Sequence, residues 1–227
     1  MELTTLLWDL DGTLFDFEKN EERSLIKVFE QFTSGCDSEK MDCYRKINHQ
    51  LWHDYECGLI GKEVIELTRF QKTFDQLGIE ADGMAASRQY REYLKQGYDM
   101  YEDTLTVLDF LKGKLEMDVV TNGDGPTQRQ RLKGTGTEDY FTHLFISDEM
   151  GVQKPAPLYF EKVLATITEK DLSRILLVGD SLHSDISGAL PFGIRTCWIN
   201  RKGIENSTGI HPDHQITELK ELIEIID

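Results

Sequence analysis

Asp9 and Asp11 lie one residue apart in the segment LLWDLDGTLFD, residues 6–16, directly after an apolar run. Two carboxylates at this spacing can hold a divalent cation, attack an electrophile, or exchange protons as general acid and base. A plain turn is the alternative, because aspartate and glycine both favour turns. A calcium-binding EF-hand loop is excluded, because it needs glycine at its sixth position and Gly12 is the fourth residue counted from Asp9.

Polar residues also follow other apolar runs in the chain. Thr121 ends the run MDVVT, and Asp180 ends the run RILLVGD, with Asp185 a little further on. Lys154 lies in the segment GVQKPAP, after the run HLFIS. Each motif is weak alone, because an Asn-Gly pair such as the one after Thr121 also marks hairpins and a lone lysine is usually solvated. Ligands of open α/β sheets bind beyond the carboxyl ends of the strands, so together these residues favour one reaction centre.

The apolar runs indicate the elements that position these residues. Near-continuous Val, Ile and Leu without alternation is typical of parallel strands buried on both faces. Five such runs occur, namely TTLLWDLDG, MDVVTNG, HLFISDEMG, RILLVGD and RTCWIN. Amphipathic helices are expected at 103–113, 157–167 and 218–226, the first with Leu105, Leu108 and Leu111 on one face. This alternation predicts an α/β fold, with a Rossmann-like doubly wound parallel sheet over residues 1–16 and 98–227.

Residues 17–97 follow a different pattern, with helical periodicity and no convincing strand. Apolar residues recur at helical spacing in EERSLIKVFEQF, in the segment from Ser38 to Gly58, in EVIELTRFQKTFDQLG and in AASRQYREYLKQG. Ser38 is the candidate N-cap of the second helix, and Gly78 is the candidate stop of the third. The pattern predicts a helical domain over 17–97, inserted after the first strand, whose aromatic residues mostly form its own core.

The composition is that of a soluble globular chain and excludes several classes of function. The 227 residues are 39% hydrophobic and 29% charged, with a formal net charge of −16. Such a surface repels nucleic acid and anionic lipid, so neither a nucleic-acid polymer nor a membrane is an expected partner. No apolar stretch reaches the length of a membrane span, no signal peptide is recognisable, and the four cysteines lack metal-binding spacing. A cytoplasmic location is expected, and an anionic substrate would need a local positive charge.

The order of these motifs resembles the haloacid dehalogenase-like hydrolase superfamily. That pattern is DxDGT near the N-terminus, a strand ending in Thr or Ser, a lysine and an acidic pair. This sequence has DLDGT at residues 9–13, then Thr121, Lys154, and Asp180 with Asp185, in the same order. The helical insertion after the first strand is similar to the alpha-helical cap domain of that superfamily.

The resemblance implies phosphoryl transfer through an aspartyl-phosphate, with Mg²⁺ as cofactor. Asp9 would be the nucleophile, and Asp11 would be the general acid and base. Dehalogenases of the superfamily resemble this pattern without a second aspartate, so Asp11 favours phosphate-ester chemistry. The implied phosphate-binding residues are Thr121, Asn122 and Lys154, and the implied Mg²⁺ ligands are Asp9, Asp11 (through its backbone carbonyl), Asp180 and Asp185.

Two segments resemble one branch of the superfamily, the pyrimidine 5′-nucleotidases of the bacterial house-cleaning type. TNGDGPTQRQRL, residues 121–132, is similar to the TNGxxxxQxxRL segment of that branch, and GDSLHSDISGALPFGIRTCWIN is similar to its SDI and TCWxN segments. Gly12 departs from the branch, which often has a second acidic residue before the threonine. The implied substrate is a small phosphorylated metabolite, a nucleoside monophosphate, over which the cap would close to exclude water. Candidates for stacking on a base, or else for packing between helices, are Phe15, Phe17, Trp52 and Tyr55.

Two alternative functions stay open at this point. A sugar-phosphate phosphatase, or a phosphomutase of the β-phosphoglucomutase type, would use the same aspartyl-phosphate and differ in its substrate or in the acceptor of the phosphoryl group. A phospho-acceptor switch protein without enzymatic turnover also combines aspartate, Mg²⁺, threonine and lysine. The Asp-x-Asp spacing and the inserted helical segment argue against the switch.

Overall fold

The computed structural model describes residues 2–226, and these residues form two compact units. The first unit contains the chain up to Phe17 together with the chain from Tyr98 onward, and the second unit is Glu18–Gly97. The predicted boundaries lie at residues 16/17 and 97/98. None of the helices in the described part of the chain is long and apolar enough to span a membrane.

Six parallel strands form a single sheet in the first unit, in the order β3-β2-β1-β4-β5-β6. Their bounds are β1 Thr5–Trp8, β2 Glu116–Thr121, β3 Leu144–Ile146, β4 Ile175–Gly179, β5 Arg195–Ile199 and β6 His214–Ile216. The first five are the apolar runs predicted as strands. Sequence reasoning missed β6, because this three-residue edge strand buries only Ile216 and therefore carries no apolar run.

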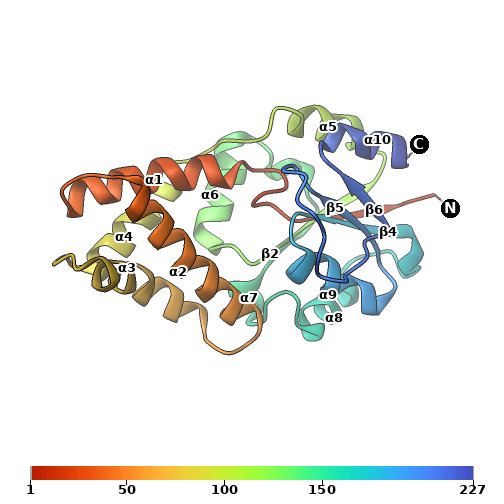
Figure 1. Ribbon diagram of the computed structural model, residues 1–227. Coiled ribbons are helices and arrows are strands. Elements are labelled where there is room, and N and C mark those ends of the chain that lie inside the picture. Colours follow the sequence, from red (N-terminus) through yellow and green to blue (C-terminus); the bar gives the residue numbers. More distant parts are fainter. Residues whose placement is uncertain (1, 227) are drawn as a thin grey trace. The chain divides into compact units, whose positions relative to one another are not determined.

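Helices cover both faces of this sheet, with α5 and α10 on one side and α8 and α9 on the other (Figure 1). Trp8 packs on the first face with Leu108 of α5 and Leu222 of α10. Leu7 packs on the second face with Phe160 of α8 and Ala189 of α9. Neighbouring residues of β1 therefore face opposite layers, which confirms the predicted doubly wound α/β sheet. The helices of this unit are α5 Thr104–Leu111, α6 Gly125–Thr135, α7 Ser147–Met150, α8 Pro157–Thr166, α9 Ser187–Ala189 and α10 Leu222–Ile226.

Two helix predictions in the first unit need correction. Leu105 is exposed, unlike Leu108 and Leu111, because a spacing of three residues moves each successive side chain about 60° around a 3.6-residue helix. The helix expected over 218–226 is a 3₁₀ turn at Leu219–Glu221 followed by α10. Glu218 and Glu221 form a reciprocal capping box at the start of this segment.

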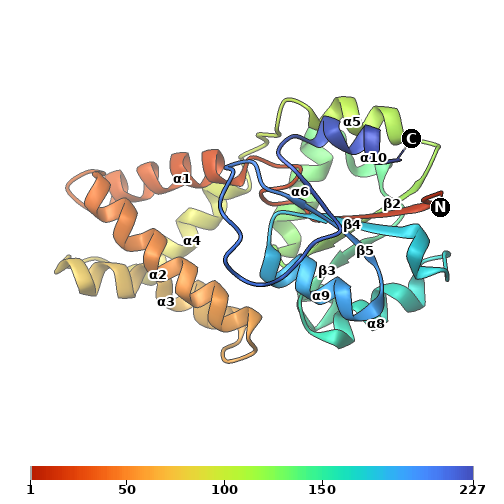
Figure 2. The same ribbon diagram turned by 45° about the vertical axis from the view of Figure 1, so that its right-hand side comes forward.

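The strand order reverses direction at β1. From β1 the chain builds outward through β2 to β3 on one side, and then returns to place β4, β5 and β6 on the other side (Figure 2). Such a reversal leaves a crevice at the carboxyl end of the central strands, where open α/β sheets bind ligands. Asp9 follows β1 at this point of reversal.

The second unit is helical, with no strand within residues 18–97. Its helices are α1 Phe17–Phe32, α2 Ser38–Glu56, α3 Lys62–Leu77 and α4 Gly83–Leu94. Asp37, instead of the predicted Ser38, is the N-cap of α2, because its side chain accepts a hydrogen bond from the Lys40 backbone N–H at 2.9 Å. Gly78 ends α3 in the left-handed conformation, as predicted.

Aromatic side chains from all four helices meet in the interior of the second unit. Phe70 is within 6.3 Å, ring centre to ring centre, of Phe29, Tyr44 and Tyr90. All four rings are fully buried. The aromatic stripes therefore form the core of this unit, as the sequence predicted.

Candidate active site

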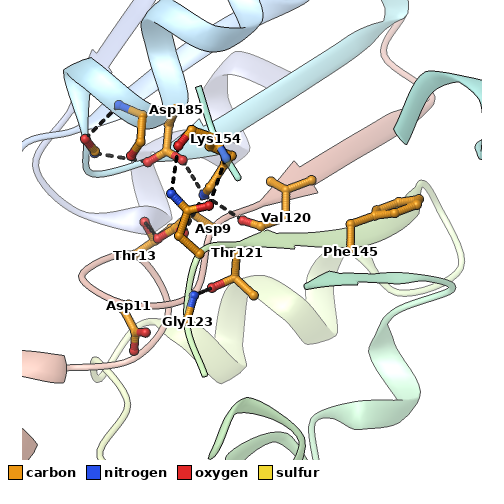
Figure 3. Close-up of polar contacts among 12 residues, drawn as sticks. Asp9, Asp11, Thr13, Val120, Thr121, Gly123, Phe145, Lys154 and Asp185 are labelled. Carbon is orange, nitrogen blue, oxygen red and sulfur yellow. Dashed lines mark hydrogen bonds and ion pairs between the residues drawn. The ribbon is translucent and has the colours of Figure 1, made fainter. Parts of the chain in front are cut away.

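Asp9 is held at the end of β1 by hydrogen bonds to both of its carboxylate oxygens. Its Oδ1 accepts from Lys154 Nζ at 2.8 Å, and its Oδ2 accepts from Thr13 Oγ1 at 3.2 Å. Its backbone N–H donates to the Val178 carbonyl in β4, which continues the sheet by one residue. The carboxylate is thus fixed at the carboxyl edge of the sheet, with only 6% of the residue exposed (Figure 3).

Lys154 lies at the centre of the polar contacts in this region (Figure 3). It lies in the loop between α7 and α8, and the residue is 1% exposed. Its Nζ contacts Asp9 Oδ1 at 2.8 Å, Asp185 Oδ1 at 2.5 Å and the Val120 carbonyl at 2.8 Å. Burial by itself would lower the pKa of this lysine, but attraction by Asp185 and Asp9 outweighs burial and raises it. Lys154 therefore stays charged and uses all three of its donors.

Asp185 and Asp180 lie near the end of β4 and face the same region. Asp185 is fully buried, with Oδ2 accepting from the Ser181 backbone N–H at 3.1 Å. Asp180 has an exposed side chain, and Gly12 lies directly against it. Gly12 has φ +84°, and a Cβ at this position would overlap Asp180 Oδ2. A side chain at this position would therefore be strained in its backbone and would have to displace Asp180.

Asp9, Asp180 and Asp185 form a cluster of carboxylates that carries more negative than positive charge. Each offers one oxygen, and these three oxygens lie within 4.8 Å of one another. Burial, only partly offset by Lys154, raises the pKa of Asp9 to about 7. Loss of solvation, and then repulsion from Asp9 and Asp185, raises the pKa of Asp180. Three carboxylates against one lysine leave two negative charges, so this all-oxygen set fits one Mg²⁺ ion.

Asp11 lies apart from this cluster, and its side chain points away from Asp9 (Figure 3). Its Oδ1 forms an ion pair with Arg131 at 2.5 Å, and its Oδ2 accepts from Gln128 Nε2 at 2.5 Å. Arg131 and Gln128 are both 1% exposed and lie three residues apart on α6, so they face the same direction. The guanidinium of Arg131 also stacks over the Phe15 ring at 4.2 Å. The Asp11 carboxylate is thus fixed by a buried cation and an amide.

Thr121 and Asn122 end β2 and lead into α6. Thr121 Oγ1 accepts a hydrogen bond from the Gly123 backbone N–H at 3.0 Å. The Asn122 side chain exchanges two hydrogen bonds with the Lys154 backbone, both at 2.9 Å, and so fixes the loop that carries the lysine. Asp124 is the N-cap of α6, which explains why the Asn-Gly pair starts a helix here instead of a hairpin. Backbone N–H groups at such a helix start favour anions.

The structure therefore brings Asp9, Lys154, Asp180 and Asp185 together, places Thr121 and Asn122 beside them, and turns Asp11 toward α6. Gln128 and Arg131, which hold Asp11, are not among the site residues predicted from the sequence. The signal available was their spacing in TQRQRL, where Leu132 follows Arg131 and marks a buried face. The spacing could not identify Asp11 as the partner of Arg131, because the two residues are 120 positions apart in the sequence.

Three of the four aromatic candidates for stacking on a base are engaged in packing. Phe15 is 1% exposed and lies in the core of the first unit, under Arg131. Tyr55 is buried with Leu51 and Ile65 in the second unit, and Trp52 packs edge-on against Tyr55 at 5.8 Å. These contacts favour the packing interpretation for the three side chains.

Comparison with known proteins agrees with this geometry. A family model described as haloacid dehalogenase-like hydrolase matches residues 6–199. The pyrimidine 5′-nucleotidase PynA of Streptococcus pneumoniae is 33% identical over 223 residues, covering 98% of this chain and 94% of PynA. The pyrimidine 5′-nucleotidase YjjG of Escherichia coli is 30% identical over 226 residues, covering 100% of this chain and 99% of YjjG.

A solved structure is similar over the same length. The crystal structure of the HAD-hydrolase YfnB from Bacillus subtilis, bound to magnesium, matches with a TM-score of 0.92 and 32% identity, covering 100% of this chain and 99% of YfnB. The fold, the DxDGT segment and these matches define one class. The chain belongs to the haloacid dehalogenase-like hydrolase family, which confirms the family resemblance inferred from its motifs.

Proposed function

We propose that this protein is a Mg²⁺-dependent phosphatase that hydrolyses small phosphomonoesters through an aspartyl-phosphate on Asp9. The observation that carries the proposal is the cluster of Asp9, Asp180 and Asp185 around a single lysine. Its two excess negative charges would repel a phosphate ester unless a divalent cation were bound, and family relatives include a protein solved with magnesium. Nucleoside monophosphates, pyrimidine ones first, are the proposed substrates, because PynA and YjjG are pyrimidine 5′-nucleotidases.

Asp9 acts as the nucleophile in this proposal. One of its oxygens forms a bond to phosphorus while the bond from phosphorus to the ester oxygen breaks. Lys154 and Thr13 hold the carboxylate in one orientation, which lowers the entropic cost of an in-line attack. Thr121 and the Asn122 backbone N–H are proposed to bind the phosphoryl oxygens, and Lys154, whose three donors are already engaged, is proposed to supply positive charge beside them.

The proposed Mg²⁺ ligands are the Asp9 carboxylate, the Asp11 backbone carbonyl, Asp180 and Asp185. The ion, when bound, neutralises negative charge on the phosphoryl group and on the carboxylates around it. Asp185 also binds Lys154 and the Ser181 N–H, so it serves to orient the lysine as well. We assign residues 18–97 to the cap domain, which would contribute to substrate selectivity.

Asp11 acts as general acid and then as general base. It donates a proton to the leaving ester oxygen, and later takes a proton from the water that attacks the aspartyl-phosphate and releases inorganic phosphate. To reach either oxygen, the carboxyl group must leave its bonds to Arg131 and Gln128. These bonds hold Asp11 at the edge of the site between turnovers.

Asp11→Asn is expected to slow both half-reactions, because the amide can neither donate nor accept the transferred proton. The expected loss in kcat is about 10²–10⁴-fold, the usual contribution of general acid–base catalysis. Steady-state phosphate release and rapid-quench measurement of the phosphorylated protein would give the two steps separately. Asp139→Asn, at an exposed position of the same unit, is the matched control and should leave both rates unchanged. Unchanged rates in Asp11→Asn would assign the proton transfers to another group.

Gly12→Ala is expected to lower both stability and activity. An alanine at φ +84° costs about 1–2 kcal/mol in the free energy of unfolding, and its Cβ must also displace Asp180. Gly113→Ala is the matched control, because Gly113 has φ +78° but its added Cβ would meet nothing within 4 Å. Urea unfolding should show a loss in both variants, and the larger loss in Gly12→Ala. Phosphate release should fall on the order of 10²-fold in Gly12→Ala alone, since displacing a site group by 1 Å can cost that much.

A phosphate-release screen tests the proposed function. Pyrimidine and purine monophosphates, sugar phosphates and an aryl phosphate would be incubated with the full chain and Mg²⁺, then with EDTA, then with Mg²⁺ restored. The proposal expects release that is fastest with a pyrimidine monophosphate, is lost with EDTA and returns with Mg²⁺. Isomer formation without free phosphate would indicate a phosphomutase. A stable phosphorylated chain without turnover would indicate a phospho-acceptor switch.

A further inference from the structure

A second group of metal-ligating side chains lies at the opposite end of β2 from Thr121. Glu116 and Asp118 belong to β2, and His143 directly precedes β3. His143 Nδ1 is 2.9 Å from Asp118 Oδ1 and 3.9 Å from Glu116 Oε1. Each of the three residues offers a ligand atom within 4.8 Å of the other two. Asp118 and Thr121 are three residues apart, or about 10 Å along a strand, so this group is separate from the candidate active site.

The sheet itself fixes the three residues as neighbours. Glu116 and Asp118 are two apart in a strand, so both side chains leave the same face. The register pairs Val119 with Leu144, which places His143 beside Asp118. The His143 backbone N–H donates to Asp118 Oδ1 at 2.9 Å, and its carbonyl accepts from the Val119 N–H at 2.9 Å. The arrangement is therefore held by the backbone and does not depend on flexible surface side chains.

Two oxygens of this group are left without the partners that a buried carboxylate needs. The Asp118 side chain is completely buried, and neither its Oδ2 nor Glu116 Oε1, both shielded from water, has a hydrogen-bond partner within residues 2–226. A buried charged oxygen without a partner is costly. A bound cation would satisfy both of these oxygens.

We propose that Glu116, Asp118 and His143 bind a divalent transition-metal ion, for which Zn²⁺ is the reference. Imidazole and carboxylate together suit Zn²⁺, whereas Mg²⁺ prefers oxygen ligands alone. Ligand atoms about 2.0–2.2 Å from a tetrahedral Zn²⁺ lie about 3.4 Å from one another. The two separations from His143 Nδ1, 2.9 and 3.9 Å, lie on either side of that value.

Solvent reaches the site from one side. The side chains of His143 and Glu116 are 33% and 23% exposed, and His143 lines a surface pocket with Arg129, Glu138 and Phe145. The pocket reaches the group at His143 and provides an entry path there. The ion would tie β2 to the segment that enters β3, so its effect is on the stability of that edge of the sheet.

Isothermal titration of the full chain with Zn²⁺, in excess Mg²⁺, tests this inference. The parent should bind one Zn²⁺ per chain, and Asp180→Asn, which alters only the proposed Mg²⁺ site, should bind it equally well. His143→Ala should weaken binding by more than 100-fold, since loss of an outer-shell partner alone costs about 10–100-fold. His211→Ala, at an exposed histidine outside the group, should bind as the parent does. Zn²⁺ should also raise the melting temperature of the parent and not that of His143→Ala.

Specific outcomes would overturn the inference. The inference fails if the parent takes up no Zn²⁺ in excess Mg²⁺, or if Asp180→Asn abolishes Zn²⁺ binding. It also fails if the parent and His143→Ala bind Zn²⁺ with equal affinity. If His143→Ala does not fold, Glu116→Gln provides the same comparison, because it keeps the size of the side chain and removes its charge. Co²⁺ offers an independent readout, since its visible spectrum reports an imidazole–carboxylate site and should be lost in either variant. None of these outcomes depends on phosphatase activity.

Discussion

Asp9→Asn is expected to abolish phosphate release, with a loss of roughly 10⁴-fold or more, as for removal of other covalent nucleophiles. Asparagine keeps the shape of the side chain and can still accept a hydrogen bond from Lys154, but its amide is a poor nucleophile. Lys154 also keeps Asp185 and the Val120 carbonyl as partners, so the fold should persist. Phosphate release under saturating substrate measures the loss, and far-UV circular dichroism checks the fold.

Mass spectrometry of acid-quenched reactions provides the decisive control for this variant. The parent and Asp11→Asn should both yield a peptide around residue 9 that carries a phosphoryl group, and Asp9→Asn should yield none. Turnover that survives in Asp9→Asn would mean that a different group attacks phosphorus. A phosphoryl group found on any other residue of the parent would have the same meaning.

Lys154→Met is expected to cost both stability and activity. Breaking a buried ion pair by removing one partner typically costs about 3–5 kcal/mol in the free energy of unfolding, and here it leaves Asp9 and Asp185 buried and facing each other. A charge about 4 Å from the phosphoryl group contributes roughly 4 kcal/mol at an effective dielectric of 20, which corresponds to about 10³-fold in rate. Urea unfolding without divalent ions and phosphate release with Mg²⁺ give the two quantities.

Lys162→Met is the matched control for this substitution. Lys162 is exposed on α8, and its Nζ contacts the Met150 carbonyl at 2.7 Å. Its loss should change the free energy of unfolding by less than about 0.5 kcal/mol and leave the rate unaltered. If Lys154→Met matched the parent in stability and rate, it would be disproved that this lysine balances the negative charge of the carboxylates.

Features that depend on local pattern could be predicted from the sequence. Five strands appeared as apolar runs, and Asp9, Thr121 and Asp180 could be placed at strand ends because parallel strands share a carboxyl edge. Lys154 could be named as a residue of the site through the family resemblance. The edge strand β6 could not be predicted, because one buried residue in three leaves no periodic signal.

Features that depend on long-range pairing could not be predicted in the same way. The ion pair of Asp11 with Arg131 joins residues 120 positions apart, and no local pattern encodes it. The side chain of Asn122 binds the backbone of Lys154 instead of pointing freely into the site, because the two loops happen to meet there. The group of Glu116, Asp118 and His143 likewise becomes a cluster only through the register of β2 with β3.

The three contacts of the Lys154 ammonium group have a consequence for how activity disappears in denaturant. Asp9 follows β1, Val120 lies in β2, and Asp185 comes shortly after β4, so one nitrogen joins the three central strands. A partly unfolded chain that released any one of these strands would also dismantle the reaction centre. Inactivation and loss of the sheet should then follow a single curve in urea, and enzyme assays would report the folding of the first unit.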